Sequence, residues 1–131
     1  MQKTITVLLI VVGIIHLLPL GGVLGAERLA ALYGLSFEEP NLAILMRHRA
    51  ILFGILGLFF VYAAFQPALQ PLAFVAGFIS VISFLGIAWS VGGYTEAIRK
   101  VILADLLAAA CLLAAVILYF IVHQKQIKLI L

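Results

Sequence analysis

The sequence has few charged residues and almost no cysteine. Only 10% of its 131 residues are charged while 66% are hydrophobic, which is too little polar surface to cover a water-soluble globule of this size. Cys111 is the single cysteine, so an intramolecular disulfide and a cysteine-rich metal site are both excluded. These deficits predict a protein whose solvent is a lipid bilayer.

The sequence also lacks the motifs that carry common catalytic chemistry. It has no phosphate-binding glycine loop, no HExxH motif, no CxxC pair and no GxSxG elbow. The segment 47–49 brings two bases and an imidazole together without an adjacent nucleophile. We therefore predict no catalytic residue, no metal site and no cofactor. This argues against an enzyme, although it does not exclude one.

The charge balance points to lipid rather than to nucleic acid. Eight Lys and Arg residues against five Asp and Glu residues give a net charge of +3. The basic residues gather near the ends of the apolar runs, where anionic lipid headgroups lie. The expected partners are therefore the bilayer, an anionic lipid or small acid, and a second copy of the chain or another membrane protein, and not a nucleic acid.

Four apolar runs are long enough to cross a membrane. A hydrocarbon core about 30 Å thick requires about 20 mostly apolar residues in a helix, and the runs 4–23, 43–65, 70–91 and 99–122 satisfy this. They lack the alternation of a barrel strand, and backbone groups in lipid must be satisfied within the segment. The predicted fold class is all-α, an antiparallel four-helix membrane bundle in which residues 1–131 form one transmembrane domain.

The first run has an alternative interpretation as a cleaved signal peptide. Lys3 precedes the apolar stretch, and the small residues Gly25 and Ala26 follow it. The stretch is long for a signal peptide, and His16 interrupts it. Leu24 would occupy position −3 of a cleavage site after Ala26, where it is unfavourable. We favour a retained span.

The connections between the runs carry their own signals. Residues 25–34 suggest a short interfacial helix with an apolar side formed by Leu29, Leu32 and Tyr33, and with Gly34 as a left-handed stop. Ser36 and Glu39 form a candidate capping box before a helix that begins near Pro40. The Pro-rich turn 66–71 predicts an antiparallel hairpin of the second and third spans, and Gly92 with Gly93 predicts the last turn.

Polar residues gather at one end of the predicted bundle. Four crossings place the termini and the 66–71 turn on one side and the long loop with the 92–93 turn on the other, and each span carries polar groups at this second end. The spans offer no counter-charge on the same helix face, so partners must come from other helices. We expect a pocket or interhelical cluster of His16, Arg47 and Asp105, with candidate rim residues Glu39, His48 and Arg99 and interfacial anchors Arg49, Trp89, Tyr94 and Lys100.

The choice between the two arginines depends on a stripe of small residues. Arg47 aligns with Ala50, Gly54 and Gly57, and membrane helices approach each other through such stripes. Arg49 instead aligns with a bulky face that suits lipid, from which its side chain could reach the headgroups. We therefore predict that Arg47 faces inward. We expect Asp105 either to pair with Arg47 or to be protonated. Two interpretations of an Arg47 and Asp105 pair remain open, a structural bridge and a ligand or proton-handling site.

The sequence resembles a known family at the start of the second span. The segment NLAILMRHRAILFGILG, with Asn41, Arg47, Ala50, Gly54 and Gly57, is similar to the DoxX-like group of small four-helix bacterial membrane proteins. The resemblance implies a four-helix fold, a bacterial inner membrane, cytoplasmic termini and, in some members, respiratory or redox partners. This chain departs from a redox interpretation because it has no cysteine pair.

The expected function is binding at the polar end of the bundle. Arg47 and His16 would donate hydrogen bonds to an anionic headgroup, a small acid or a partner carboxylate. The alternative is a small proton-coupled transporter subunit that acts as an oligomer, since small multidrug transporters are also four-helix chains of similar size. Those transporters use a glutamate in their first span, where this chain has only His16.

Overall fold

Proline and glycine mark most of the helix ends in the computed structural model, which describes residues 1–131. Helix α1 spans Gln2–Leu17 and continues as a 3-10 helix, η1, over Leu18–Leu24. The change falls beside Pro19, which cannot donate a backbone hydrogen bond to the carbonyl four residues earlier. The predicted first span corresponds to α1 and η1 together.

A short helix comes next, where one was predicted. Helix α2 spans Ala26–Tyr33 and ends at Gly34, whose φ of 68° lies in the left-handed region that glycine adopts without strain. Tyr33 and Leu29 are buried, and with Phe37 they form a small apolar cluster. This cluster is separate from the main core and packs against the first turns of the last helix.

Helix α3 spans Pro40–Ala64 and begins with Pro40 at a position where the missing N–H costs nothing. Its cap differs from the prediction. Glu39 is itself the N-cap and accepts hydrogen bonds from the backbone N–H groups of Asn41 and Leu42 at 3.0 and 2.7 Å. The capping box built on Ser36 is therefore wrong, because Glu39 still has an extended backbone and the helix starts only after it.

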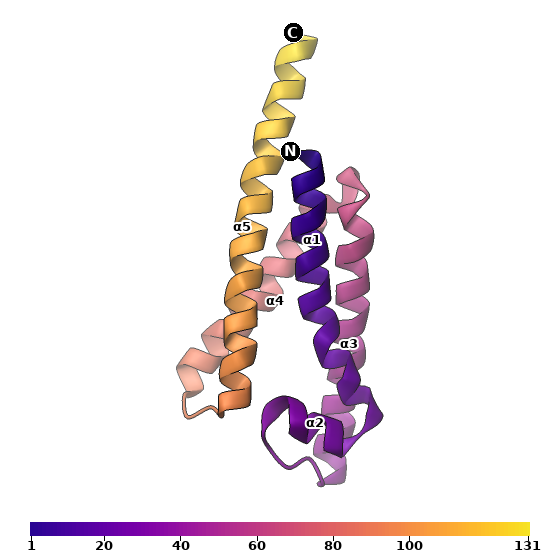
Figure 1. Cartoon of the computed structure of the whole chain (residues 1–131), viewed down its shortest axis with the longest axis vertical. Coiled ribbons are helices and arrows are strands. Elements are labelled where there is room, and N and C mark those ends of the chain that lie inside the picture. The colour runs from indigo at the N-terminus through magenta and orange to yellow at the C-terminus, as the bar shows by residue number, and fades with distance from the viewer.

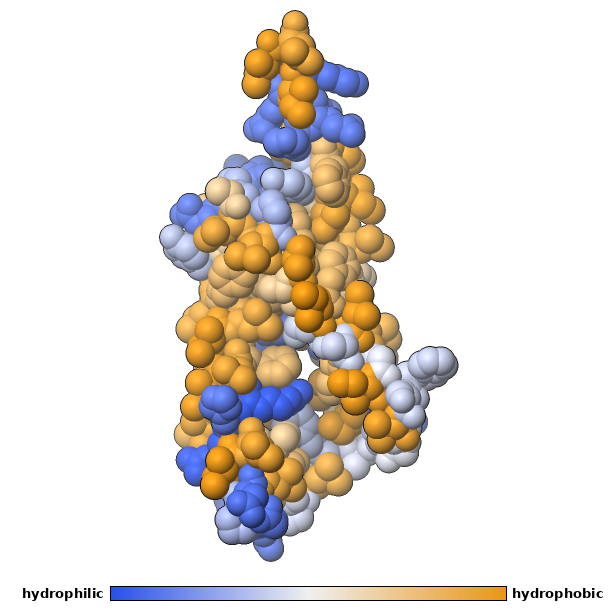
Figure 2. All heavy atoms as spheres, turned by 180° about the vertical axis from the view of Figure 1, so that it is seen from behind, coloured by the Kyte–Doolittle hydropathy of each residue, from blue (hydrophilic) through white to orange (hydrophobic).

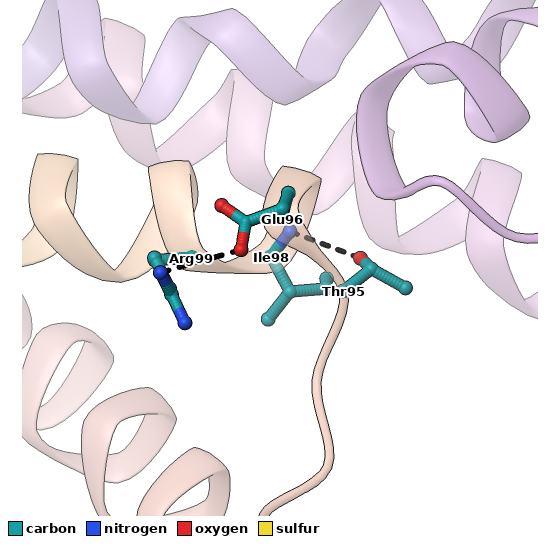
Figure 3. Close-up of polar contacts among 4 residues, drawn as sticks. All are labelled: Thr95, Glu96, Ile98 and Arg99. Atoms are coloured by element: carbon teal, nitrogen blue, oxygen red, sulfur yellow. Dashed lines mark hydrogen bonds and ion pairs between the residues drawn. The ribbon is translucent and has the colours of Figure 1, made fainter.

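The turns that precede the last two long helices lie where they were predicted. A 3-10 turn, η2, covers Pro67–Leu69, and α4 spans Gln70–Val91. Gly92 and Gly93 then adopt φ values of 66° and 63°. Helix α5 spans Glu96–Ile130, and the Thr95 hydroxyl accepts a hydrogen bond from the Ile98 N–H at 3.2 Å as its N-cap (Figure 3).

Helix α1 lies at the centre of the arrangement. It packs against α3 and α5, while α4 packs mainly against α5 and makes few contacts with α3. Figure 1 shows α4 leaving the turn beside the top of α3 and crossing behind α1 toward α5. α3 and α4 run in opposite directions, and because α4 diverges toward α5 the two helices make few contacts with each other. This divergence leaves space between α3 and the lower ends of α4 and α5.

Small residues allow α1 and α3 to cross closely. A Cβ atom added at Gly57 would lie 2.8 Å from the Gly13 carbonyl oxygen, and one added at Gly13 would lie 2.9 Å from the Gly57 carbonyl oxygen. Such backbone contact is typical of small-residue packing between membrane helices. All four long helices contribute to one apolar core, made of Ile5, Leu9, Val12, Phe60, Ala63, Ala64, Ala73, Phe74, Val81, Ala108, Leu112 and Ala115.

Four helical segments are long and apolar enough to cross a membrane, as a multi-pass membrane protein requires. They are Gln2–Leu24, Pro40–Ala64, Pro67–Val91 and Glu96–Ile130. Figure 2 shows apolar surface over most of the length of the molecule and hydrophilic atoms concentrated toward its ends. The last helix has 35 residues, about 52 Å at 1.5 Å per residue, so it continues well past the predicted end at 122.

Candidate functional site

A cavity of about 320 Å³ lies at the end of the molecule that carries α2. Every helix contributes to its wall: α1, η1 and α2 on one side, α3 and α5 on others, and α4 through Phe84 alone. Ten of its 15 lining residues are hydrophobic. Figure 2 shows the surface hollowed in this lower part of the molecule, with hydrophilic atoms bordering apolar ones. The site is therefore mostly apolar with a few polar groups, the composition of small-molecule pockets.

Arg49 places a positive charge in this cavity. Its Nη1 donates a hydrogen bond to the Tyr33 hydroxyl at 2.7 Å, and its guanidinium carbon lies 4.5 Å from the centre of the Phe53 ring. The face of an aromatic ring attracts a cation, so these two groups hold the guanidinium in an apolar setting. No carboxylate lies within ion-pair distance of it. The remaining N–H donors are available to a ligand.

His16 lies in the wall of the same cavity and links two helices. It is 2% exposed, its Nδ1 lies 2.8 Å from the Val12 carbonyl oxygen, and its Nε2 lies 3.0 Å from the Ser80 Oγ on α4. A carbonyl only accepts, so Nδ1 donates and Nε2 is left to accept from the Ser80 hydroxyl, an arrangement that fits a neutral imidazole. As predicted, His16 has a partner on another helix.

Asp105 and Lys100 line the cavity from α5. Together with Ala97, Val101 and Ala104 they occupy one side of the helix at spacings of three and four residues. Asp105 is half-buried and accepts no hydrogen bond, and the single ion pair of the molecule, between Glu96 and Arg99, lies elsewhere. The carboxylate is near enough to Arg49 for electrostatic attraction but forms no salt bridge with it. The structure thus brings His16 and Asp105, two of the three residues of the predicted cluster, to the wall of one cavity.

Arg47 does not line the cavity, so the placement predicted for the two arginines is reversed. Arg47 is exposed, and its Nε donates a hydrogen bond to the Val23 carbonyl oxygen of η1 at 2.9 Å. The small stripe on α3 packs against α1 through Gly57 and against η1 through Gly54, and Arg47 lies at the η1 end of that contact. The bulky face of α3, which carries Arg49 and was predicted to meet lipid, is turned inward. Its Phe60 is fully buried against the His16 ring. A bridge between Arg47 and Asp105 is absent.

The three candidate rim residues also lie outside the cavity wall. Glu39 caps α3, and His48 is exposed without a hydrogen-bond partner. Figure 3 shows Arg99 beside Glu96 on the first turn of α5, where Nη1 and Oε1 are 3.3 Å apart in an exposed ion pair. The cavity is therefore bordered by Tyr33 and Lys100 rather than by these three residues.

The predicted anchors separate into two groups. Trp89 and Tyr94 are 88% and 45% exposed and lie beside a groove between α4 and α5, so they stay candidates for contact with the membrane interface. Arg49 and Lys100 instead line the cavity. Two of the four predicted anchors are thus the main cationic groups of the site.

Tyr33 is the functional residue that the sequence analysis missed. It was assigned only to the apolar side of α2, yet its hydroxyl binds Arg49 and its carbonyl oxygen accepts a 2.8 Å hydrogen bond from the Thr95 hydroxyl. These two bonds fasten α2 to α3 and to α5 across the cavity. The sequence feature that could have predicted this role is the amphipathic character of tyrosine, whose hydroxyl usually forms a hydrogen bond when the ring is buried.

Comparison of the chain with protein-family models, with curated proteins and with solved structures finds no match. The structure contains no cluster of three or more His, Cys, Asp or Glu side chains with the geometry to hold a metal ion. The chemistry that the site supports must therefore be argued from the cavity and its polar groups.

Proposed function

We propose that this chain is a binding protein of a bacterial inner membrane, in which four spans form an antiparallel bundle and the cavity receives an anionic group. The apolar surface and the four long helices support the membrane location. The start of α3, with its similarity to DoxX-like proteins, supports the bacterial inner membrane and cytoplasmic termini. On this proposal α2 lies at the opposite membrane interface and closes the cavity from the water side.

One observation carries the binding proposal: Arg49 sits in a largely apolar cavity with no acidic partner in ion-pair contact. A charge in low-dielectric surroundings costs free energy unless an opposite charge or hydrogen bonds compensate it. The Tyr33 hydroxyl and the Phe53 ring compensate only part of this charge. An incoming anion would complete the compensation, and a carboxylate or phosphate matches the fork of guanidinium N–H groups.

A lipid headgroup, a small acid and the carboxylate of a partner protein all present this chemistry. Their common feature is an anionic oxygen pair that two N–H groups of Arg49 would bind, with Lys100 adding a second positive charge. The cavity volume of about 320 Å³ is at the lower end of the range for small-molecule sites. A headgroup or a small acid therefore fits better than a large ligand.

The two arginines provide a matched test. The protein is placed in nanodiscs of zwitterionic lipid and titrated with ¹³C-carboxyl octanoate, with empty nanodiscs as the blank. Arg49→Gln should weaken binding about tenfold or more, the loss expected for a charge-assisted hydrogen bond, whereas Arg47→Gln should change it by less than about twofold. Equal effects of the two substitutions, or no saturable binding to the unsubstituted protein, would overturn the proposal.

A proton-coupled transporter subunit is the second candidate function. It is favoured by the presence of two titratable groups, His16 and Asp105, in the wall of one cavity within the membrane spans. Intramembrane ionisable residues commonly mark ion or proton pathways. The test is substrate-dependent proton flux in liposomes, and no flux with a broad panel of organic cations and acids would exclude this candidate.

A further inference from the structure

With Asp105 ionised, the charged lining of the cavity carries one net positive charge. The half-buried Arg49 and the exposed Lys100 are cationic and the Asp105 carboxylate is anionic, while His16 has both ring nitrogens engaged in the pattern of a neutral imidazole. A ligand with a single negative charge would leave the occupied site neutral. A dianion would leave it negative and a neutral ligand would leave it positive, and either state is costly in a low-dielectric setting.

The uncharged part of the cavity favours an apolar chain behind the anionic head. The lining is predominantly hydrophobic and includes Ile15, Leu18, Phe53 and Phe84. The polar groups lie together around Arg49, so a bound head would be fixed there while apolar surface covers the chain attached to it. Because α4 diverges from α3, the hollow opens on a flank of the molecule whose surface is largely apolar, which on the proposed membrane location is where a lipid-borne chain can approach.

We propose that the cavity is selective for a singly charged amphiphilic anion, whose head binds Arg49 and whose aliphatic chain occupies the apolar lining. This inference rests on the proposed anion-binding function and specifies its ligand class. Asp105 is the residue that sets the selectivity, since its carboxylate offsets one of the two positive charges of the lining and disfavours a second negative charge on the ligand.

Two probes of equal chain length test the charge selectivity. Octyl sulfate is a monoanion, and octyl phosphate at pH 8 is mainly a dianion because its second pKa is about 6. Each is titrated into the protein in zwitterionic nanodiscs. Octyl sulfate should bind at least about tenfold more tightly than octyl phosphate, the factor expected from one uncompensated charge. An equal or tighter affinity for octyl phosphate overturns the proposal.

Substitution of Asp105 makes the test quantitative. Electrostatic energy scales with ligand charge, so if Asp105→Asn raises the affinity for the monoanion by some factor, it should raise that for the dianion by about the square of that factor. Lys100→Gln should change the ratio in the opposite direction, which keeps the test valid should one variant fail to fold. Glu96→Gln removes a carboxylate from the same helix outside the cavity and is the matched control. An affinity ratio that both cavity substitutions leave unchanged contradicts the proposal.

Acetate distinguishes a membrane-borne amphiphile from a free small acid. It presents the same head as octanoate without the chain, and each methylene buried in the cavity should add about three- to fourfold in affinity. Equal binding of acetate and octanoate would refute the amphiphile. A different result is that Arg49→Gln abolishes binding of all probes while the unsubstituted protein binds the monoanion no more tightly than the dianion. That result would support the anion-binding function and refute only the charge selectivity.

Discussion

Arg49 is held by groups that position its charge without cancelling it. The Tyr33 hydroxyl accepts one N–H at 2.7 Å, and two aromatic rings lie against the guanidinium at 4.5 and 5.6 Å. Aromatic faces and a hydroxyl stabilise a cation more weakly than a carboxylate does, so most of the binding capacity of Arg49 remains available. At this scale the site depends on the precise anchoring of one side chain.

Tyr33→Phe should loosen that anchor while keeping the buried ring. The substitution removes one charge-assisted hydrogen bond, so octanoate affinity in nanodiscs should fall about three- to tenfold. Tyr62→Phe, at an exposed position on α3 whose hydroxyl forms no hydrogen bond, is the control and should leave the affinity unchanged. An unchanged affinity in Tyr33→Phe would show that the hydroxyl has no part in positioning Arg49.

The Glu39 cap should make stability depend on pH in a defined direction. The pKa of the Glu39 carboxyl is lowered because the carboxylate accepts hydrogen bonds from the backbone N–H of Asn41 and then of Leu42. A folded-state pKa below the unfolded value means that this contribution is complete above about pH 4.3, the usual glutamate pKa, and disappears as the pH falls through the folded value.

The measurement compares thermal unfolding of the unsubstituted protein with that of Glu39→Ala in detergent. The unfolding temperature of Glu39→Ala should be lower at pH 7, and the difference should shrink at pH 3. Glu38→Ala is the control, since Glu38 makes no capping hydrogen bond. A difference that stays constant between the two pH values would mean that the carboxylate is not the stabilising form.

At the scale of the elements, α1 and α3 cross with their backbones in close contact. Each helix presents a glycine to a backbone carbonyl of the other, so neither position has room for a side chain. This crossing also fixes where His16 and Arg49 lie relative to each other, since the two residues belong to these two helices. The geometry of the cavity therefore depends on a contact some distance along the bundle from it.

Gly57→Ala should destabilise the protein despite the higher helix propensity of alanine. The new Cβ would lie 2.8 Å from the Gly13 carbonyl oxygen, so the helices must separate at a cost of about 1–3 kcal/mol. Gly86→Ala on α4 meets nothing within 4 Å and should be neutral or stabilising by up to about 1 kcal/mol. Unfolding in detergent, followed by circular dichroism, measures both, and equal stability of the two variants would contradict the tight crossing.

The elements themselves were largely predictable from sequence, because apolar run length and the Pro and Gly positions determine where membrane helices begin and end. Which face of α3 points inward was not predictable from sequence. Residues two positions apart on a helix point about 200° apart, so only one of Arg47 and Arg49 could face inward. The small stripe identified where α1 touches α3, but the cavity adjoins a different part of the buried arc, next to Phe53. Locating a cavity requires the third and fourth helices, which a single-helix pattern does not describe.

At the scale of the whole molecule, the ionisable groups that line the cavity lie at the end that carries α2, while Lys3, Lys125 and Lys128 lie at the opposite end, near the termini. The sequence predicted by counting crossings that polar groups of the spans gather at one end, and His16 and Asp105 line one cavity at the α2 end. The packing of α4 on α5 instead of α3 was not predictable, because both neighbours offer apolar faces and lipid solvates either arrangement equally well. The opening of the cavity results from that arrangement.

An even number of crossings should place both termini on one side of the membrane. Reporter fusions after Leu131 and after Gln66 should give the same orientation, and a fusion after Ser36 should give the opposite one. Alkaline phosphatase, active outside the cytoplasm, and a fluorescent protein, active inside, serve as complementary reporters. Identical results for Ser36 and Leu131 would require an even number of crossings between them instead of the three expected, and would remove the cavity from its proposed position.

The exposed end of α4 gives the protein a built-in optical probe. Trp89 is the only tryptophan and Cys111 the only cysteine, and they lie on α4 and α5, the two helices that pack together away from α3. A quencher attached to Cys111 would report through Trp89 emission whether these helices move apart when a ligand enters. Brominated lipids would report the depth of Trp89 in the bilayer. Both measurements use the natural sequence, so the mobility of the cavity wall can be followed without any substitution.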